Sequence, residues 1–106
     1  MTATVDPRFR PVVDAFAGDP RVTSGMMMSS YGLKVKNKIF AMYGRGQFVA
    51  KLPRDRVLQL VREKRGQQFD PGHGRLMKEW IATDSLPEMW VELAREAYAF
   101  VGQTSE

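Results

Sequence analysis

The sequence predicts an α+β domain in which an antiparallel β-sheet packs against helices on one of its faces. Residues 9–16 and 86–101 repeat apolar side chains at helical spacing, whereas much of 22–52 alternates apolar and polar side chains as half-buried strands do. The connections within 22–52 are too short for parallel crossovers. We therefore expect the element order αββββαβα, with about four to five strands in a meander.

The bulk composition fits one domain spanning residues 1–106, with an ordered part from about residue 6 to residue 101. Of the 106 residues, 43% are hydrophobic and 10% aromatic, which is enough to form a core without disulfide bonds. No cysteine is present, which excludes disulfides, thiolate zinc sites and cysteine nucleophiles. The sequence shows neither a secretory signal nor an apolar run long enough to span a membrane, so we expect a cytoplasmic protein.

The first helix is expected near the start of the chain. Asp6 is of a type favoured at the N-cap, and Pro7 suits the first helical position. The sequence Gly-Asp-Pro at residues 18–20 stops the helical pattern. The apolar positions of this helix are Phe9, Val12, Val13 and Phe16.

The strands of the meander are expected within residues 22–52. Tyr31, Leu33 and Val35 alternate with Gly32, Lys34 and Lys36, the pattern of a half-buried strand. Asn37 falls where a tight turn is expected. The four segments are residues 22–28, 31–36, 39–43 and 47–52, with the turn Gly44-Arg45-Gly46 before the last of them.

A second helix and a short strand are expected after the meander. The helix begins at Pro53 and ends at Gly66, a residue type favoured just beyond helix ends. A loop over residues 69–74 then leads to a strand at about 78–83. The apolar side of the helix is expected to consist of Val57, Leu58, Leu60 and Val61.

The last helix is predicted to open with a capping box formed by Ser85 and Glu88. Residues 102–106 are expected to fray. We expect both tryptophans, Trp80 and Trp90, to anchor the core. The buried stripe of the last helix is predicted to be Leu86, Trp90, Leu93, Ala97 and Val101.

The residues that could carry chemistry are few. His73 is the single histidine, and glycines on both sides of it indicate a bend rather than a catalytic arrangement. We therefore expect no catalytic, cofactor-binding or metal-binding residues, and no cofactor. An alternative hypothesis, from a different functional class, is an enzyme or small-ligand pocket. It would be formed by the candidate functional loop residues His73 and Arg75 together with Tyr31.

A basic region lies in the first half of the chain. Residues 1–53 carry eight Lys and Arg against three Asp and Glu, whereas 54–106 carry eight against nine. Basic side chains near aromatic ones, here Tyr31 and Tyr43, can grip single-stranded nucleic acid, although a solvated sheet face gives the same pattern. The candidate nucleic-acid-binding residues are Lys34, Lys36, Lys38, Arg45 and Lys51.

Five segments carry a family resemblance. They are residues 22–23 (Val-Thr), 27–33 (Met-Met-Ser-Ser-Tyr-Gly-Leu), 38–42 (Lys-Ile-Phe-Ala-Met), 48–53 (Phe-Val-Ala-Lys-Leu-Pro) and 69–80 (Phe-Asp-Pro-Gly-His-Gly-Arg-Leu-Met-Lys-Glu-Trp). In this order the segments resemble the N-terminal domain of TfoX-like proteins, and the last is also similar to the YjbR-like group. Ser29-Ser30 stand where the family has a glycine pair, and Met28 where it usually has phenylalanine.

The resemblance implies an α+β domain with no established catalytic residues, in a family whose TfoX member is associated with the regulation of competence genes. We therefore expect a non-catalytic binding or regulatory domain that acts through contacts with an unknown protein partner. The alternative is a nucleic-acid-binding module that uses the basic region. No membrane partner is expected, and the chain is expected to be a monomer or a weak homodimer.

Overall fold

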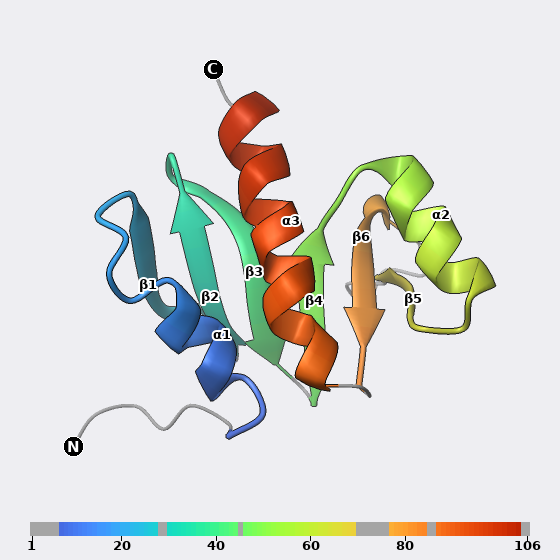
Figure 1. Ribbon diagram of the computed structural model, residues 1–106, viewed down its shortest axis with the longest axis horizontal. Helices are drawn as coiled ribbons and strands as arrows, with labels where there is room; N and C mark the ends of the chain where they lie inside the picture. The colour runs from blue at the N-terminus through green and yellow to red at the C-terminus, as the bar shows by residue number, and fades with distance from the viewer. Residues whose placement is uncertain (1–6, 28–29, 45, 70–76, 85–86, 105–106) are drawn as a thin grey trace.

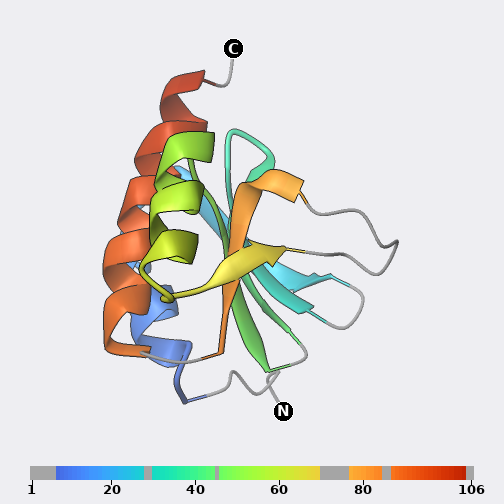
Figure 2. The same ribbon diagram turned by 90° about the vertical axis from the view of Figure 1, so that its right-hand side faces the viewer.

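The computed structural model describes residues 7–27, 30–44, 46–69, 77–84 and 87–104, and it confirms the α+β class. One antiparallel six-stranded sheet has the order β1-β2-β3-β4-β6-β5. All the helices lie on the same face of this sheet (Figures 1 and 2). In chain order the elements are α1 (Arg10–Ala15), β1 (Val22–Met27), β2 (Ser30–Val35), β3 (Lys38–Gly44), β4 (Gln47–Lys51), α2 (Arg54–Arg62), β5 (Gln67–Phe69), β6 (Met77–Thr83), the 3₁₀ turn η1 (Pro87–Met89) and α3 (Trp90–Thr104).

The sheet contains one strand that the sequence does not reveal. β5 follows α2 directly and pairs antiparallel with β6, with Gln67 opposite Ala82 and Gln68 opposite Ile81. A segment of three residues, Gln-Gln-Phe, is too short to show the alternation that marks a strand. The described residues therefore hold six strands rather than four to five, and the element order is αββββαββα with η1 before α3.

The hairpin between β2 and β3 confirms the predicted turn at Asn37. Lys36 has φ 51° and Asn37 has φ 69°, the two left-handed conformations that a type I′ turn requires. A bulge follows, because Leu33 lies opposite Ala41 whereas Lys34 lies opposite Ile39. The extra residue between them is Phe40, and as a result both Phe40 and Ala41 are buried in the core.

The core lies between the sheet and the helices. Trp90, at the start of α3, is completely buried and stacks on Phe48, with ring centroids 5.1 Å apart and planes 10° apart. The predicted stripe of α3 is confirmed for Trp90, Leu93, Ala97 and Val101, all of which are buried. The predicted Leu86 and the capping residue Ser85 lie outside the described residues.

Two helix boundaries differ from the predicted ones. α1 begins at Arg10, with Phe9 in the N-cap position and no side-chain capping hydrogen bond, and the predicted N-cap Asp6 lies outside the described residues. α3 continues to Thr104, past residue 102, where the sequence predicts that fraying begins. A six-residue helix with no side-chain cap depends on packing for its stability, and the fully buried Phe9 and Val12 supply that packing.

The end of α2 also differs from the prediction. The helix stops at Arg62, not at Gly66, and Lys64 takes the left-handed conformation with φ 60°. Arg65 N–H donates to the carbonyl of Leu60 (2.9 Å) and Lys64 N–H to that of Val61 (3.0 Å). These two bonds form a Schellman motif, in which glycine is the usual residue at the position of Lys64. Leu58, predicted to lie on the apolar side of α2, is instead exposed at 38%.

Replacing Lys64 with glycine is expected to raise the free energy of unfolding by about 0.5–1 kcal/mol, because a side chain in the left-handed region is strained by roughly that amount. Urea denaturation measures the change. Lys64→Ala is the matched control, since it removes the same charge but keeps a side chain at positive φ. An equal gain from the alanine variant would show that charge, not backbone strain, is responsible.

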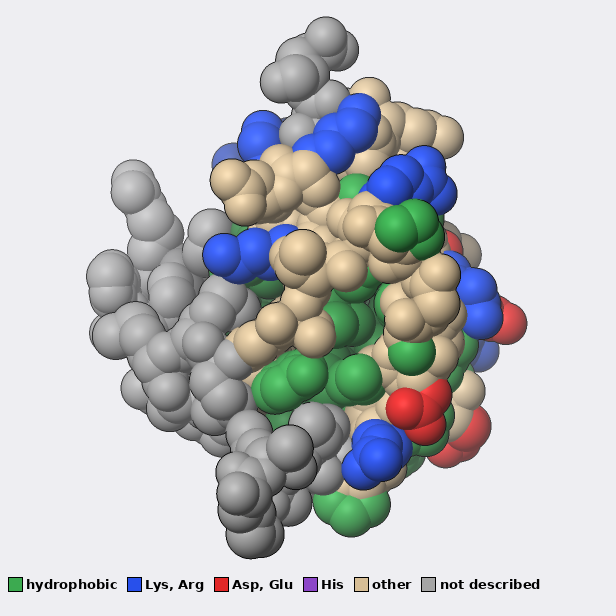
Figure 3. All heavy atoms as spheres, turned by 90° about the vertical axis from the view of Figure 1, so that its left-hand side faces the viewer, with side chains coloured by type: hydrophobic (Ala, Val, Ile, Leu, Met, Phe, Trp, Pro, Cys, Tyr) green, Lys and Arg blue, Asp and Glu red, His purple; other side chains and the backbone are tan. Residues whose placement is uncertain are grey.

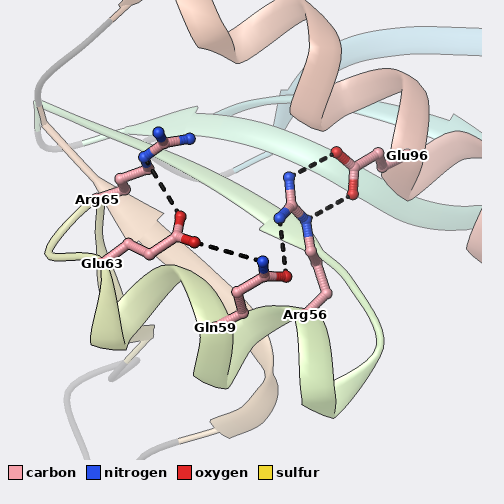
Figure 4. A network of polar contacts seen from close by, with 5 residues as sticks. All are labelled: Arg56, Gln59, Glu63, Arg65 and Glu96. Atoms are coloured by element: carbon pink, nitrogen blue, oxygen red, sulfur yellow. Dashed lines mark hydrogen bonds and ion pairs between the residues drawn. The ribbon is translucent and has the colours of Figure 1, made fainter.

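A polar network joins α2 to α3 on the outside of the helical layer (Figure 4). Arg56 donates two hydrogen bonds to the carboxylate of Glu96, at 2.9 Å and 3.0 Å, and a third to Gln59 (3.1 Å). The bonds to Glu96 are the main reason that the pKa of Arg56 is raised. Gln59 donates to Glu63, which pairs in turn with Arg65 at 3.4 Å.

The pair of Arg56 and Glu96 is expected to contribute a coupling energy of about 1 kcal/mol. Its bidentate geometry strengthens the interaction, whereas partial exposure to solvent weakens it by screening the charges. The side chains are 27% and 37% exposed. The measurement is a double-mutant cycle of Arg56→Ala and Glu96→Ala by chemical denaturation. Additive effects of the two single substitutions would mean that the contact does not stabilise the fold.

Candidate binding surface

The face of the sheet that points away from the helices is the main candidate site. Ala50 on β4 and Ile81 on β6 pair with each other and both lie in the core. Since side chains alternate along a strand, their neighbours Lys51 and Trp80 point to the opposite face. We call this side the open face, and no described helix lies on it (Figure 2). The register places on it Thr23, Gly25, Gly32, Lys34, Ile39, Met42, Val49, Lys51, Gln67, Trp80 and Ala82.

The centre of the open face is apolar. Val49 and Ala82 lie side by side there and are buried, with 3% and 1% exposure. Ile39, Met42 and Trp80 are half-buried. The solvated face of an antiparallel sheet is usually polar, whereas here Ile39, Met42 and Trp80 keep part of their apolar surface exposed.

Trp80 is not the core anchor that the sequence predicts. It is half-buried on the open face, where it lies opposite Lys51 in the register of β4 and β6. The ammonium of Lys51 is 5.7 Å from the centre of the Trp80 ring and 4.0 Å from a carboxylate oxygen of Glu79. A cation over an indole face is an attractive arrangement, and it gives this part of the open face an aromatic and basic character.

The structure gathers four of the five predicted basic residues toward one end of the sheet. Lys34 lies on β2, two strands from Lys51 on β4, a separation of about 10 Å at ordinary strand spacing. Lys36 lies in the turn between β2 and β3, and Lys38 begins β3, both exposed. Arg45 lies outside the described residues, and its neighbour Gly44 is at the opposite end of β3 from Lys38.

Two further basic residues at this end are missed by the sequence. Arg54 opens α2 just after β4, and Lys78 lies near the start of β6, where that strand runs beside the end of β4. Both are exposed, and with Leu58 and Gln68 they line a hollow of about 330 Å³. Arg54 follows Lys51 closely in the sequence, whereas Lys78 is far from it in the sequence and is brought near by the pairing of β4 with β6. We call the set Lys34, Lys36, Lys38, Lys51, Arg54 and Lys78 the basic end.

The tyrosines predicted to accompany the lysines are on the other face. The Tyr31 ring lies 6.2 Å from that of Phe9, and its hydroxyl donates to Ser24 (3.3 Å). Tyr43 lies 5.7 Å from Phe9, in a stacked arrangement. Both therefore support α1 instead of the basic end. His73 and Arg75 lie outside the described residues, so their predicted association with Tyr31 is not described.

A second hollow, of about 420 Å³, lies at the other end of β4 and β6. Its lining is polar and includes Gln47, Lys64, Gln67 and Asp84, with the buried Thr83 beneath. These groups can donate and accept hydrogen bonds. They are nevertheless separated from the Lys51 and Trp80 pair by the length of a strand, so this hollow is not part of the basic end.

Within the ranges that the structure describes, no group of three or more His, Cys, Asp and Glu side chains comes together as a metal site would need. None of the helices in that part of the chain combines the length and the apolar character required to cross a membrane.

A titratable contact ties the segment before β1 to α3. Tyr98 donates from its hydroxyl to Asp19 (2.7 Å), and Arg21 donates its backbone N–H to the other carboxylate oxygen (2.8 Å). The bond from Tyr98 is the largest cause lowering the pKa of Asp19 below 3.8, and the bond to Asp19 raises the pKa of Tyr98 above 10.0. This contact is structural and lies outside the open face.

The contact between Asp19 and Tyr98 is expected to stabilise the fold only in the pH range in which Asp19 is ionised and Tyr98 is still protonated. Asp19 has a depressed pKa, so its contribution is complete above 3.8 and is lost as the pH falls through the folded-state pKa. Tyr98 has a raised pKa, so its contribution is complete below 10.0 and is lost as the pH rises further. Spectrophotometric titration of the wild type minus that of Tyr98→Phe isolates the Tyr98 phenol. A midpoint at or below 10.0 would contradict the contact.

The fold and surface define the class of this protein as an α+β domain with an open antiparallel sheet, one face of which is partly apolar and basic and carries no described helix. Comparison with protein-family models, with curated proteins and with solved structures found no match for the chain. The resemblance to the TfoX N-terminal domain therefore stays a prediction.

Proposed function

We propose that this chain is a non-catalytic binding domain whose open face holds a protein partner in the cytoplasm. The observation that carries the proposal is that Ile39, Met42 and Trp80 are only half-buried on a sheet face on which no described helix lies. A sheet with apolar side chains on both faces is stable in water when both faces are covered. α1, α2 and α3 cover one face (Figure 1), and the partner covers the other.

The charges around the apolar centre indicate what the partner offers. Lys34 lies opposite Ile39, and Lys51 lies on the next strand, β4. Met42 lies further along β3, between Gly32 and Val49. A complementary segment places apolar side chains over Ile39 and Met42 and carboxylates beside the two lysines, because paired charges fix orientation and speed association. The resemblance to the TfoX N-terminal domain, which implies a regulatory role without catalytic residues, agrees with this proposal.

Affinity capture from native lysate tests the proposal with a matched pair of variants. Ile39→Glu places a charge on the open face, and Leu58→Glu places the same charge on α2, at a side chain that is already 38% exposed. We expect Ile39→Glu to reduce recovery of the partner by about tenfold or more, since it removes an apolar contact and sets a carboxylate beside Lys34, where it repels the carboxylates of the partner. Leu58→Glu is expected to leave recovery unchanged. Equal recovery by both variants, or no specific partner of the wild type, would reject the proposal.

A second candidate function is the binding of single-stranded nucleic acid at the same face. It is favoured by one observation, the Lys51 ammonium over the Trp80 ring with Lys34 two strands away. Base stacking on an aromatic side chain contributes about 1–3 kcal/mol per base, and lysines neutralise the phosphates.

Fluorescence anisotropy with single- and double-stranded DNA at low and moderate salt separates this candidate from the first. It predicts binding that prefers single strands, falls steeply with salt and is lost in Trp80→Ala. Charge reversal at both Lys34 and Lys36 is expected to weaken binding further. No binding at low salt, where electrostatic attraction is strongest, would exclude nucleic acid and leave the protein partner.

A further inference from the structure

β1 forms one edge of the sheet, and the strand itself has none of the proline, charge or irregularity that usually protects an edge. It is six residues long, contains neither proline nor a charged residue, and pairs with β2 in unbroken register from Val22 to Met27. The other edge, β5, is only three residues long, and its pairing is interrupted between Gln68 and Phe69. Short, irregular or charged edges resist pairing with other chains, whereas long, regular and neutral edges promote it.

The backbone groups on the outer side of β1 can be identified. Val22 N–H donates to the carbonyl of Asp19 (3.1 Å) and therefore points away from β2. Since alternate residues of a strand direct their N–H and C=O groups to opposite sides, those of Ser24 and Met26 also point outward. Among the described residues, no strand pairs with this side of β1.

We propose that a second copy of this chain pairs with β1 in antiparallel orientation, around a two-fold axis at Ser24. Ser24 then exchanges backbone hydrogen bonds with the partner's Ser24, and Met26 N–H donates to the carbonyl of the partner's Val22. Because Val22 N–H is already used by Asp19, the pairing makes about four backbone hydrogen bonds.

The side chains of β1 favour its own copy as the occupant. In this register Thr23 lies opposite the partner's Gly25, and no charged residue of β1 faces another, so the pairing escapes like-charge repulsion. A Cβ atom at Gly25 would meet nothing within 4 Å, which leaves room for the facing threonine. Figure 3 shows hydrophobic side chains in the middle of this side of the molecule and charged ones toward its rim, the usual anatomy of an interface.

The geometry has a consequence for the open face. A two-fold axis between antiparallel edge strands runs perpendicular to the sheet, so the helices of both copies lie on one side and both open faces on the other. The pairing extends the sheet and places two binding surfaces next to each other. The proposed interface is formed by β1 alone, so it does not depend on what the open face binds. Edge pairing buries less than the roughly 1,200 Å² of stable complexes, so the dimer forms in a concentration-dependent way.

Sedimentation velocity over a concentration series up to about 1 mM, the range in which weak interfaces associate, tests the dimer. Ser24 is exposed, so Ser24→Lys preserves the fold and sets two ammonium groups against each other at the axis. Gln67→Lys adds the same charge to the other edge strand, at an exposed residue of β5. The proposal predicts dimers for the wild type and Gln67→Lys but a monomer for Ser24→Lys. A monomeric wild type, or a dimer that Ser24→Lys leaves intact, would overturn it.

A second measurement identifies which edge of the sheet forms the interface, because disulfide formation traps even a weakly populated dimer. The chain has no cysteine, so Ser24→Cys creates a single reporter at the axis. Hydrogen-bonded antiparallel neighbours have Cα atoms about 5.5 Å apart, a separation that a disulfide can span. We expect Ser24→Cys to form disulfide-linked dimers at least about tenfold faster than Gln67→Cys under the same mild oxidation. Equal rates for the two variants would overturn the β1 interface.

Discussion

Replacing Trp90 with alanine is expected to lower the free energy of unfolding by about 3–5 kcal/mol, the range measured for large aromatic residues lost from a core. Trp90 has no exposed surface and stacks on Phe48 at 5.1 Å. Tyr43 packs against the same indole at 5.6 Å, and the Arg8 guanidinium lies 5.7 Å from it. The substitution therefore opens a cavity where α3, β3, β4 and the segment before α1 meet.

Trp80→Ala is the matched control, because it removes the same side chain from the open face. Trp80 is half-buried and makes one described aromatic contact, with Lys51. We expect a loss of only about 1 kcal/mol, typical of a partly exposed cation–π pair. Urea denaturation followed by circular dichroism measures both variants. Similar losses for the two tryptophans would show that the open face is packed as tightly as the core.

Phe9→Ala is expected to destabilise the domain by about 3–4 kcal/mol, because the removed ring is fully enclosed by other aromatic rings. Phe9 lies 5.7 Å from Tyr43, 6.1 Å from Phe48 and 6.2 Å from Tyr31. α1 has six residues and no side-chain cap, so it depends on this contact to stay on the sheet. Amide hydrogen exchange should show α1 losing protection before β2 and β3 do.

Phe9→Leu provides the control for this prediction. A leucine keeps most of the apolar volume, and we expect it to cost less than about 1.5 kcal/mol. If the alanine and leucine variants unfold at the same urea concentration, Phe9 does not anchor α1.

The meander and the last helix could be predicted because their patterns are local. Leu33 and Val35 alternate with polar residues, and Trp90, Leu93 and Ala97 repeat at helical spacing, and all five are buried as expected. β5 could not be predicted, since its three residues form a strand only because β6 lies beside them. The exposure of Leu58 likewise depends on how α2 is rotated against the sheet, which neighbouring residues do not determine.

The helix ends show the same dependence on tertiary structure. Gly66 is the residue that favours a helix end, yet the structure uses Lys64 in the left-handed position. A Cβ atom at Gly66 would lie 3.0 Å from the Ala82 carbonyl oxygen and from Ile81. Glycine is therefore favoured there by the close approach of the chain to β6, a reason that does not appear in the local sequence.

The candidate site was predicted in part. Lys34 and Lys51 could be found as basic residues at strand positions, but the partner of Lys51 is Trp80, which follows it by 29 positions in the printed sequence. The sequence places Tyr31 with the basic region, because the alternation of a strand shows which residues share a face but not which face the helices cover. The position of Tyr31 beside Phe9 settles this for β2.

The central claim is that the open face is the surface through which this domain acts. Its most direct test is site-specific photo-crosslinking in living cells, with a photoreactive amino acid at Met42 on the open face or at Leu58 on α2. We predict a discrete crosslinked protein from position 42 and none from position 58, because the partner covers the half-buried centre of the sheet. Crosslinks from position 58 alone, or from neither position, would contradict the claim.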